Sequence, residues 1–286
     1  MKSVKPYTIV KSSFVEEQIN SPEQALVQDL IVVEEPLEIW LKCSRNQSSA
    51  KLLFTTMRTP NDDINLVRGW LYSSGAIQDV NDILAINHTG TGRLKKQTTN
   101  QVLVTLNGDF DWQAYQRLDV VNSACGVCGQ QSIENLLEKL AKRSFHKIAE
   151  QKLNKSALLE LAEQLRARQT IFAQTGGIHG AALFDMRAKM FDVREDVGRH
   201  NALDKLIGAN VKRLSGDEKM AFGIVLSGRV SFELVQKAAM ANIRYIVAMG
   251  APTSLAIDIA KDCDICLIGF VKSSGFNCYC GWDSLQ

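Results

Sequence analysis

Short apolar runs alternate with helical segments from residue 221 to residue 270, and this alternation limits the chain to few folds. Residues 221–226 (AFGIVL) are almost all apolar, as expected of a strand that is buried on both faces. The segments expected after this strand are a turn at 227–229, a helix at 232–241, a strand at 245–248, a helix opened by 250–254 and a strand at 266–270. Repeated strand–turn–helix units predict an α/β sheet with helices on both faces.

The N-terminal part of the chain has a different pattern and predicts a smaller α+β unit. Its expected elements are strands at 31–33, 37–41 and 51–54, a helix that begins after 59–63, and a strand at 102–106.

Two helices are expected between these parts, one beginning near Ser132 and one at 156–174 that ends at Gly176. We therefore divide the chain into three parts: a small α+β N-terminal domain (1–118), a mobile Cys-x-x-Cys loop (119–131) and an α/β domain (132–286).

Composition narrows the possible classes of protein. The 286 residues are 45% hydrophobic, enough for a sizeable core, and the net charge of +2 gives little support to general nucleic-acid binding. Residues 1–11 lack the apolar centre of a secretory signal, and no apolar run is long enough to span a membrane. We expect a cytoplasmic protein that binds neither nucleic acid nor membrane.

A cysteine pair with two residues between its members, Cys125 and Cys128, has a glycine directly after each cysteine. This spacing is compatible with half of a zinc site, with a redox disulfide, or with a thiolate that carries sulfur. Cys125 lies a few residues before an expected helix start, where unpaired backbone N–H groups lower a thiol pKa. Cys128 has the spacing to attack a persulfide on Cys125 and release sulfide.

The other cysteines favour simpler roles. Cys266 belongs to an apolar strand and is expected to share a face with Ile268 and Phe270, as a small buried hydrophobe. Cys263 is expected in the turn before it. Cys278 and Cys280 can point the same way from an extended tail, so a four-cysteine zinc site remains an alternative, but we predict no bound metal.

Residues at the ends of the expected parallel strands are candidates for binding an anion. Ser227, Gly228 and Arg229 follow one strand and precede a helix, a place where helix N-termini often bind phosphate. His200 and His179 can hydrogen-bond a pterin or phosphate, with Asp196 orienting His200. Alternatively, a turn is tied to a helix start through caps and salt bridges made by Asp196, Arg199, His200 and Asp204.

Six segments carry a resemblance when they are taken in order. They are 125–129 (CGVCG), 175–182 (TGGIHGAA), 195–205 (EDVGRHNALDK), 227–237 (SGRVSFELVQK), 251–256 (APTSLA) and 267–270 (LIGF). Together they resemble the formate dehydrogenase accessory sulfurtransferase (FdhD-like) family. The resemblance implies a three-layer sheet domain similar to the cytidine-deaminase fold, preceded by the smaller α+β domain.

The resemblance also implies a function. Cys125 accepts persulfide sulfur from a cysteine desulfurase and transfers it to the molybdenum bis-guanine-dinucleotide cofactor before the cofactor enters formate dehydrogenase, the client. It implies a homodimer, and it places cofactor contact on Phe270, Val271, Lys272, Ser273, Ser274 and Gly275. Lys272 stands where an arginine is common, and it can still meet a phosphate as a point charge.

Two rival functions follow from the same residues. A zinc deaminase needs a His-x-Glu pair and a Pro-Cys-x-x-Cys pair, but Ala124 precedes Cys125 and no glutamate follows His179 at that spacing. A cofactor-binding chaperone that inserts the cofactor without moving sulfur would need only the C-terminal pocket, and it remains the main alternative.

Overall fold

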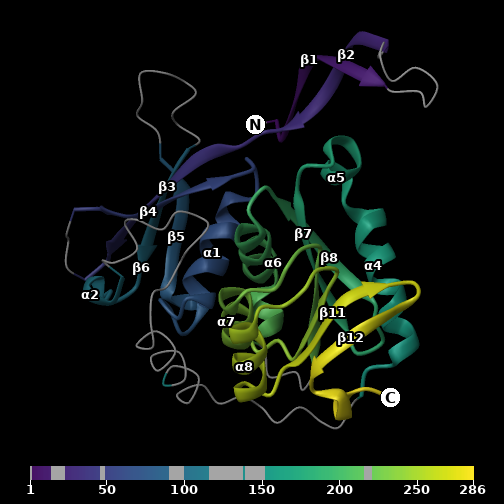
Figure 1. The fold of residues 1–286 in the computed structure, drawn as a ribbon. Coiled ribbons are helices and arrows are strands. Elements are labelled where there is room, and N and C mark those ends of the chain that lie inside the picture. The colour runs from purple at the N-terminus through teal and green to yellow at the C-terminus, as the bar shows by residue number, and fades with distance from the viewer. Residues whose placement is uncertain are drawn as a thin grey trace.

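The computed structural model describes residues 2–13, 23–45, 49–89, 100–115, 138, 152–215 and 221–286. Three sheets and the helices between them make up this part of the chain (Figure 1). The expected helix near Ser132, the loop 119–131 and the boundary at residue 118 lie outside the described residues, so the proposed division into domains stays a prediction. No helix of the described ranges is both long and apolar enough to cross a membrane.

The larger sheet has six strands in the order β12-β11-β10-β9-β7-β8. Its strands are β7 (His179–Asp185), β8 (Met190–Asp196), β9 (Phe222–Leu226), β10 (Tyr245–Ala248), β11 (Cys266–Lys272) and β12 (Gly275–Cys280). The central strands β9, β10 and β11 are parallel, whereas β7, β8 and β12 run antiparallel to their neighbours.

Helices cover both faces of this sheet (Figure 1). On one face lie α6 (Arg199–Leu214), α7 (Phe232–Met240) and α8 (Ser254–Asp262), and on the other lies α4 (Lys155–Arg168). Alternate strand residues enter the two cores: Ile224 packs with α6 and α7, whereas Val225 packs with α4. This confirms the predicted three-layer α/β arrangement and explains why the strands are apolar on both faces.

A four-stranded sheet forms the N-terminal unit, in the order β4-β3-β6-β5. Its strands are β3 (Glu35–Cys43), β4 (Lys51–Arg58), β5 (Ile83–His88) and β6 (Gln101–Leu106), with the short helix α2 (Trp112–Tyr115) after them. Helix α1 (Asp63–Ser73) lies between this sheet and α6. One hydrophobic cluster runs from the small sheet through α1 and α6 into the large sheet.

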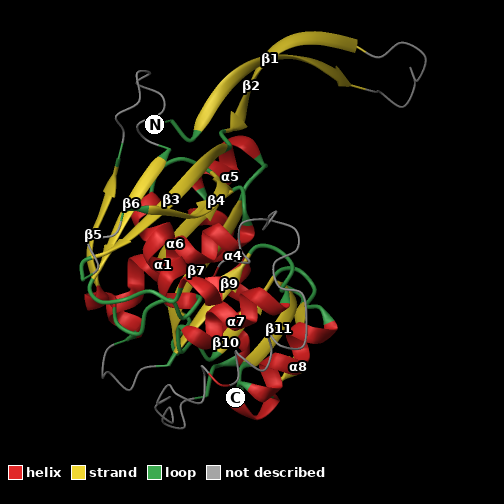
Figure 2. Cartoon of the chain, turned by 90° about the vertical axis from the view of Figure 1, so that its left-hand side faces the viewer, coloured by secondary structure: helices red, strands yellow, loops and turns green. Residues whose placement is uncertain are grey.

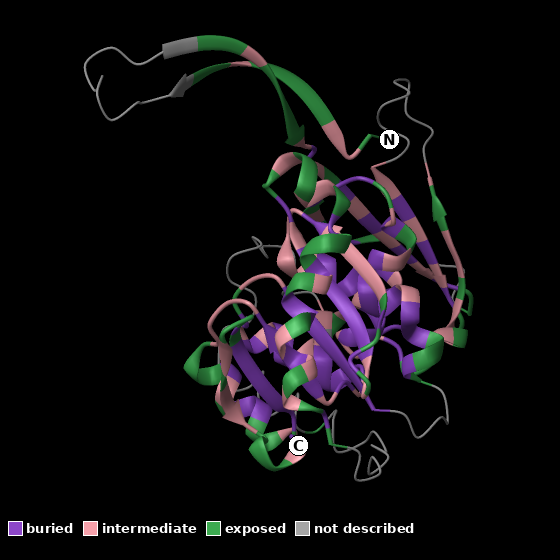
Figure 3. Ribbon diagram, turned by 90° about the vertical axis from the view of Figure 1, so that its right-hand side faces the viewer, coloured by how far each residue is buried: buried purple, intermediate pink, exposed green. Residues whose placement is uncertain are grey.

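A long hairpin, β1 (Val4–Ser13) and β2 (Glu23–Val32), extends beyond both sheets (Figure 2). Most of its residues are exposed, in contrast to the buried strands of the large sheet (Figure 3). The sequence pattern predicted a strand only at 31–33, so most of this hairpin was missed. Its described side chains enter neither hydrophobic cluster, and they lack the regular alternation on which strand prediction depends.

The helix expected at 156–174 is two helices, because the chain breaks at Gln169 between α4 and α5 (Thr170–Thr175). The Gln169 side chain is buried against Gly180 of β7, and the first N–H groups of α5 donate to the Glu195 carboxylate of β8. The expected end is confirmed, since Gly176 takes a left-handed conformation with φ of 65°.

Helices α1 and α6 cross with their backbones in direct contact. A Cβ added to Gly69 of α1 would overlap the carbonyl of Asp204, and a Cβ added to Gly208 of α6 would overlap the carbonyl of Asn65. Only glycine on both helices permits this approach. The crossing therefore fixes where α6 lies relative to the N-terminal unit.

We predict that Gly69→Ala lowers the free energy of unfolding by about 3 kcal/mol, because the added methyl meets backbone that cannot turn away. Urea unfolding followed by circular dichroism measures this. Gly177→Ala is the matched control: its Cβ would lie 3.6 Å from Val32 Cγ1, an ordinary contact. That variant should stay within about 0.5 kcal/mol of the parent. Equal stability of the two variants would contradict the role of the crossing.

Candidate functional site

The candidate site lies at one edge of the large sheet, where four strands end and one begins. The parallel strands β9, β10 and β11 end there. Because β7 is antiparallel to β9, it begins at this edge, and β8 ends beside it. Helices α6, α7 and α8 each begin just after one of these strand ends, so three helix N-termini face this edge. This is the arrangement expected from the strand–turn–helix pattern.

Glycines let the loops at this edge pack closely. A Cβ on Gly228 would lie 3.2 Å from the His179 ring, and a Cβ on Gly250 would lie 2.7 Å from the carbonyl carbon of Gly228. Gly269 in turn lies against the carbonyl of Gly250. These contacts join the ends of β7, β9, β10 and β11 into one continuous surface.

Ser227 fixes the loop after β9 to the beginning of β7. Its Oγ accepts a hydrogen bond from the Gly180 N–H at 2.9 Å, and its own N–H donates to the Gly180 carbonyl at 3.0 Å. Ser227 is thus held to the sheet, and the exposed Arg229 two residues later projects from an anchored loop.

Four basic side chains, His179, Arg199, His200 and Arg229, gather at this edge, and we call them the basic cluster. Burial lowers the pKa of His179, and the charges of Arg199 and His200 lower it further; Asp196 opposes the shift and Arg229 adds to it. Because the charges of Arg199, His200 and Arg229 all act on His179, the four groups lie close to one another. His179 is therefore held neutral near pH 7.

His200 has a carboxylate partner that the sequence did not indicate. Its Nε2 lies 2.7 Å from Glu233 Oε2 and 3.3 Å from Ser231 Oγ, both at the beginning of α7. Asp196 makes a different set of contacts: it pairs with Lys205 at 2.6 Å and accepts hydrogen bonds from the N–H groups of Gly198 and Thr59. The expectation that Asp196 orients His200 is wrong, because Glu233 is the carboxylate that contacts the His200 ring.

Asp196 instead ties the turn before α6 to the helix itself, the alternative that the sequence left open, and it also contacts the N-terminal unit at Thr59. Asp196 and Lys205 are 0% and 2% exposed, so this is a buried ion pair. Burial raises the pKa of Asp196, while the Lys205 ammonium and the N–H groups of Gly198 and Thr59 oppose that rise. The Lys205 Nζ also donates to the Thr59 carbonyl at 2.8 Å, which links α6 to the segment before α1.

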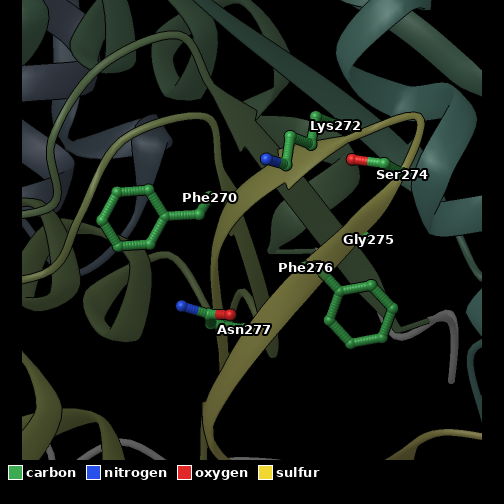
Figure 4. A pocket seen from close by; sticks show the side chains of 6 residues that line it. All are labelled: Phe270, Lys272, Ser274, Gly275, Phe276 and Asn277. Atoms are coloured by element: carbon green, nitrogen blue, oxygen red, sulfur yellow. The ribbon is translucent and has the colours of Figure 1, made fainter.

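An open pocket of about 560 Å³ lies on the hairpin of β11 and β12. The residues that line it are Phe270, Lys272, Ser274, Gly275, Phe276 and Asn277 (Figure 4). Phe270 and Asn277 extend to the same side of the hairpin, and Phe276 extends to the other. Four of the six residues belong to the segment 270–275, and the structure therefore brings much of that predicted segment together.

A β-bulge places Phe270 in the pocket. The register between β11 and β12 shifts between Gly269 and Lys272, and Phe270 has a φ of 54°, which is rare for a non-glycine residue. Phe270 is 46% exposed, so the expectation that it shares the buried face of Cys266 and Ile268 is wrong. Val271 takes the core position instead.

The same hairpin explains where two other predicted residues lie, Val271 and Ser273. It also explains why two residues that were not predicted, Phe276 and Asn277, line the pocket. Val271 is 3% exposed, so its side chain points away from any ligand in the pocket, and Ser273 lies in the exposed turn. Phe276 and Asn277 were missed because they reach the pocket only when β12 folds back on β11. The N–H of Phe270 donates to the Gly250 carbonyl at 3.3 Å, which joins the pocket to the edge with the basic cluster.

Five cysteines lie in the described part of the chain, and all are held as neutral thiols. Burial raises the pKa of Cys43, Cys266, Cys278 and Cys280, and it raises that of Cys263 to about 11. Among the described residues, no group of three or more side chains could hold a metal ion. Cys125 and Cys128 lie outside the described residues.

The fold and the site thus define a three-layer α/β protein whose parallel strands end at a basic, glycine-lined edge beside an aromatic pocket. Residues 32–286 match the FdhD/NarQ family, and the chain belongs to this family.

Relatives support this assignment. A protein of Corynebacterium efficiens named sulfur carrier protein FdhD is 42% identical over 261 residues, covering 88% of this chain and 90% of its own length. One of Picrophilus torridus with the same name is 36% identical, with 90% and 92% covered. The crystal structure of a protein of Desulfotalea psychrophila, described as a formate dehydrogenase accessory protein, shares the fold. Its TM-score is 0.69 at 18% identity, over 98% of this chain and 99% of that one.

We predict that Lys205→Met lowers the free energy of unfolding by about 3–5 kcal/mol, because it leaves the Asp196 carboxylate buried without its cation. Thermal and urea unfolding measure the loss. Adding Asp196→Asn to that variant should restore part of it, since no unpaired charge then remains. A double variant whose loss equals the sum of the two single losses would contradict a direct interaction between these groups.

Proposed function

We propose that the protein is a sulfur carrier needed for formate dehydrogenase activity, with Cys125 as the carrying residue. One observation of the structure supports this choice above others: the five described cysteines are all shifted toward the unreactive thiol form. Sulfur transfer requires a thiolate. Cys125 and Cys128 are the two remaining cysteines of the seven. The family and the names of the relatives agree with this function.

In the proposed reaction the Cys125 thiolate attacks the terminal sulfur of a persulfide on a cysteine desulfurase. A sulfur–sulfur bond forms at Cys125, the donor's sulfur–sulfur bond breaks, and the donor cysteine leaves as a thiolate. The protein therefore acts as a sulfurtransferase whose own thiol holds the sulfur between the two partners.

Cys128 gives a route for release. Its thiolate attacks the inner sulfur of the Cys125 persulfide, a Cys125–Cys128 disulfide forms, and hydrosulfide leaves toward the acceptor. A thiol reductant of the cell must then restore both thiols. The proposed acceptor is the molybdenum bis-guanine-dinucleotide cofactor, which is a substrate that gains a sulfur ligand and then enters formate dehydrogenase.

The pocket and the neighbouring sheet edge are the proposed binding surface for this cofactor. The exposed ring of Phe270 offers a face for a guanine base, and Asn277 offers an amide to the edge of that base. Lys272 supplies a positive charge for a phosphate. The adjoining sheet edge is lined by Ser227, Gly228, Arg229 and His200. We also propose a homodimer that works in the cytoplasm.

A cofactor-binding chaperone without sulfur transfer is the alternative function, because it would use the same pocket and need neither loop thiol. Transfer of sulfur to Cys125 separates the two proposals.

We expect that incubation of the full chain with a cysteine desulfurase and L-cysteine adds about 32 Da to the peptide that contains Cys125. Intact-mass and peptide mass spectrometry measure the adduct. Cys125→Ala should remove it, whereas Cys263→Ala, which changes a thiol with a pKa near 11, should leave it unchanged. An unmodified Cys125 peptide, or sulfur carried on the described cysteines instead, would favour the chaperone.

A further inference from the structure

The basic groups of the cluster outnumber the carboxylates that pair with them. Glu233 pairs with His200, and Asp196 is committed to Lys205 and to the backbone. Within the described residues, the guanidinium groups of Arg199 and Arg229 make no ion pair or hydrogen bond, and neither does the His179 ring. Three cationic or potentially cationic groups thus face one edge of the sheet without a counter-ion from the described chain.

The backbone adds to the same field. His200 lies in the first turn of α6 and reaches Ser231 and Glu233 at the start of α7, so these two helix N-termini lie side by side. Neither helix has a side-chain hydrogen bond at its N-cap residue, Gly198 or Ser231. In the described residues the backbone N–H groups of Arg199 and His200 at the start of α6 make no hydrogen bond, and the dipole of α6 favours a negative charge in front of them. In α7 the Leu234 N–H already donates to the Ser231 carbonyl at 3.1 Å.

Glycine lets the loops beside these groups pack closely. Gly228 lies against the His179 ring, where any added Cβ would be 3.2 Å from it. Gly250 packs against the backbone of Gly228 and Arg229. These contacts hold His179 and Arg229 at the same edge of the sheet.

We propose that the basic cluster is a binding site for a dianionic phosphate-type group, held by Arg199 and Arg229 with His179 and His200 beside them. Planar guanidinium groups match the paired oxygens of such a group, and helix N-termini bind it through their N–H groups. The proposal deepens the proposed function, since a diphosphate of the cofactor is one source of this chemistry. It does not depend on sulfur transfer by Cys125.

Binding at this site is coupled to a proton on His179. In the free protein, burial and the neighbouring cations hold the pKa of His179 below its ordinary value. A dianion placed among the same groups reverses that field and raises the pKa. Between the two pKa values binding takes up a proton, so affinity is greatest at lower pH and falls as pH rises through the pKa of the complex. The titratable groups facing His179 are Arg199, His200, Arg229 and Asp196, with Glu233 beside His200.

Histidine NMR on the full chain tests the proposal, because the chain contains only four histidines. Sulfate is the first probe, since it stays a dianion from pH 5 to pH 8, and chloride at matched ionic strength is the reference. Inorganic diphosphate and guanosine diphosphate are the second and third probes. The His179 signal is assigned by its loss in His179→Gln.

We expect a saturable rise of the His179 pKa with sulfate and with diphosphate. Arg199→Gln and Arg229→Gln should each weaken the affinity roughly ten-fold, as loss of a charged bidentate donor does. Arg187→Gln is the matched control, because Arg187 is exposed in the turn at the other end of β7 and should leave the affinity unchanged. Circular dichroism confirms that each variant is folded.

Two results would overturn the site: a His179 pKa that is the same in sulfate and chloride, or a shift that persists in both arginine variants. A shift with sulfate and diphosphate but not with guanosine diphosphate would assign the site to a free anion rather than to a nucleotide. The same titration in Cys125→Ala keeps the outcomes separate, because the shift should survive there even if the sulfur-carrier proposal fails.

Discussion

The backbone contact between α1 and α6 is the constraint on which the candidate site depends. Gly69 and Gly208 bring the two helices together without intervening side chains, so α6 has one position relative to the N-terminal unit. The buried pair of Lys205 and Asp196 fixes its rotation and the turn that leads into it. Because Arg199 and His200 lie in the first turn of α6, the placement of half of the basic cluster follows from this packing.

A second buried contact extends the same constraint to α7. Lys237 pairs with the Asp204 carboxylate at 2.8 Å and also donates to Ser73 Oγ, so α1, α6 and α7 share one polar contact within an apolar core. The N-termini of α6 and α7 are thereby held side by side. A site for an anion between two helices needs this rigidity, because its donors must stay aimed at one point without rearrangement.

Much of the large sheet and its helices could be predicted from local sequence. The strand 245–248 has the observed bounds of β10, and Thr253 begins α8 as a capping residue, because burial on both faces and helix capping leave direct marks in the sequence. The features that were missed arise from contacts between distant segments. The break at Gln169 depends on Gly180 and Glu195, and the bulge at Phe270 depends on pairing with β12.

The same distinction applies to the site. Residues 227–229 and His200 lie at the candidate site because they follow strand ends and precede or begin helices. Glu233 and Asn277 were missed because only the fold brings them to His200 and to the pocket. The sequence therefore predicted which loops meet at the candidate site, whereas packing determines which side chains pair within them.

We propose that one sheet edge, from the first turn of α6 through 227–229 to the pocket at 270–277, binds the nucleotide part of the cofactor. Hydrogen–deuterium exchange of the full chain with and without guanosine diphosphate tests it most directly. We expect slower exchange in peptides covering 199–202, 227–232 and 270–277, with the hairpin β1–β2 unchanged. Protection confined to other segments, or no protection at all under saturating nucleotide, would contradict it.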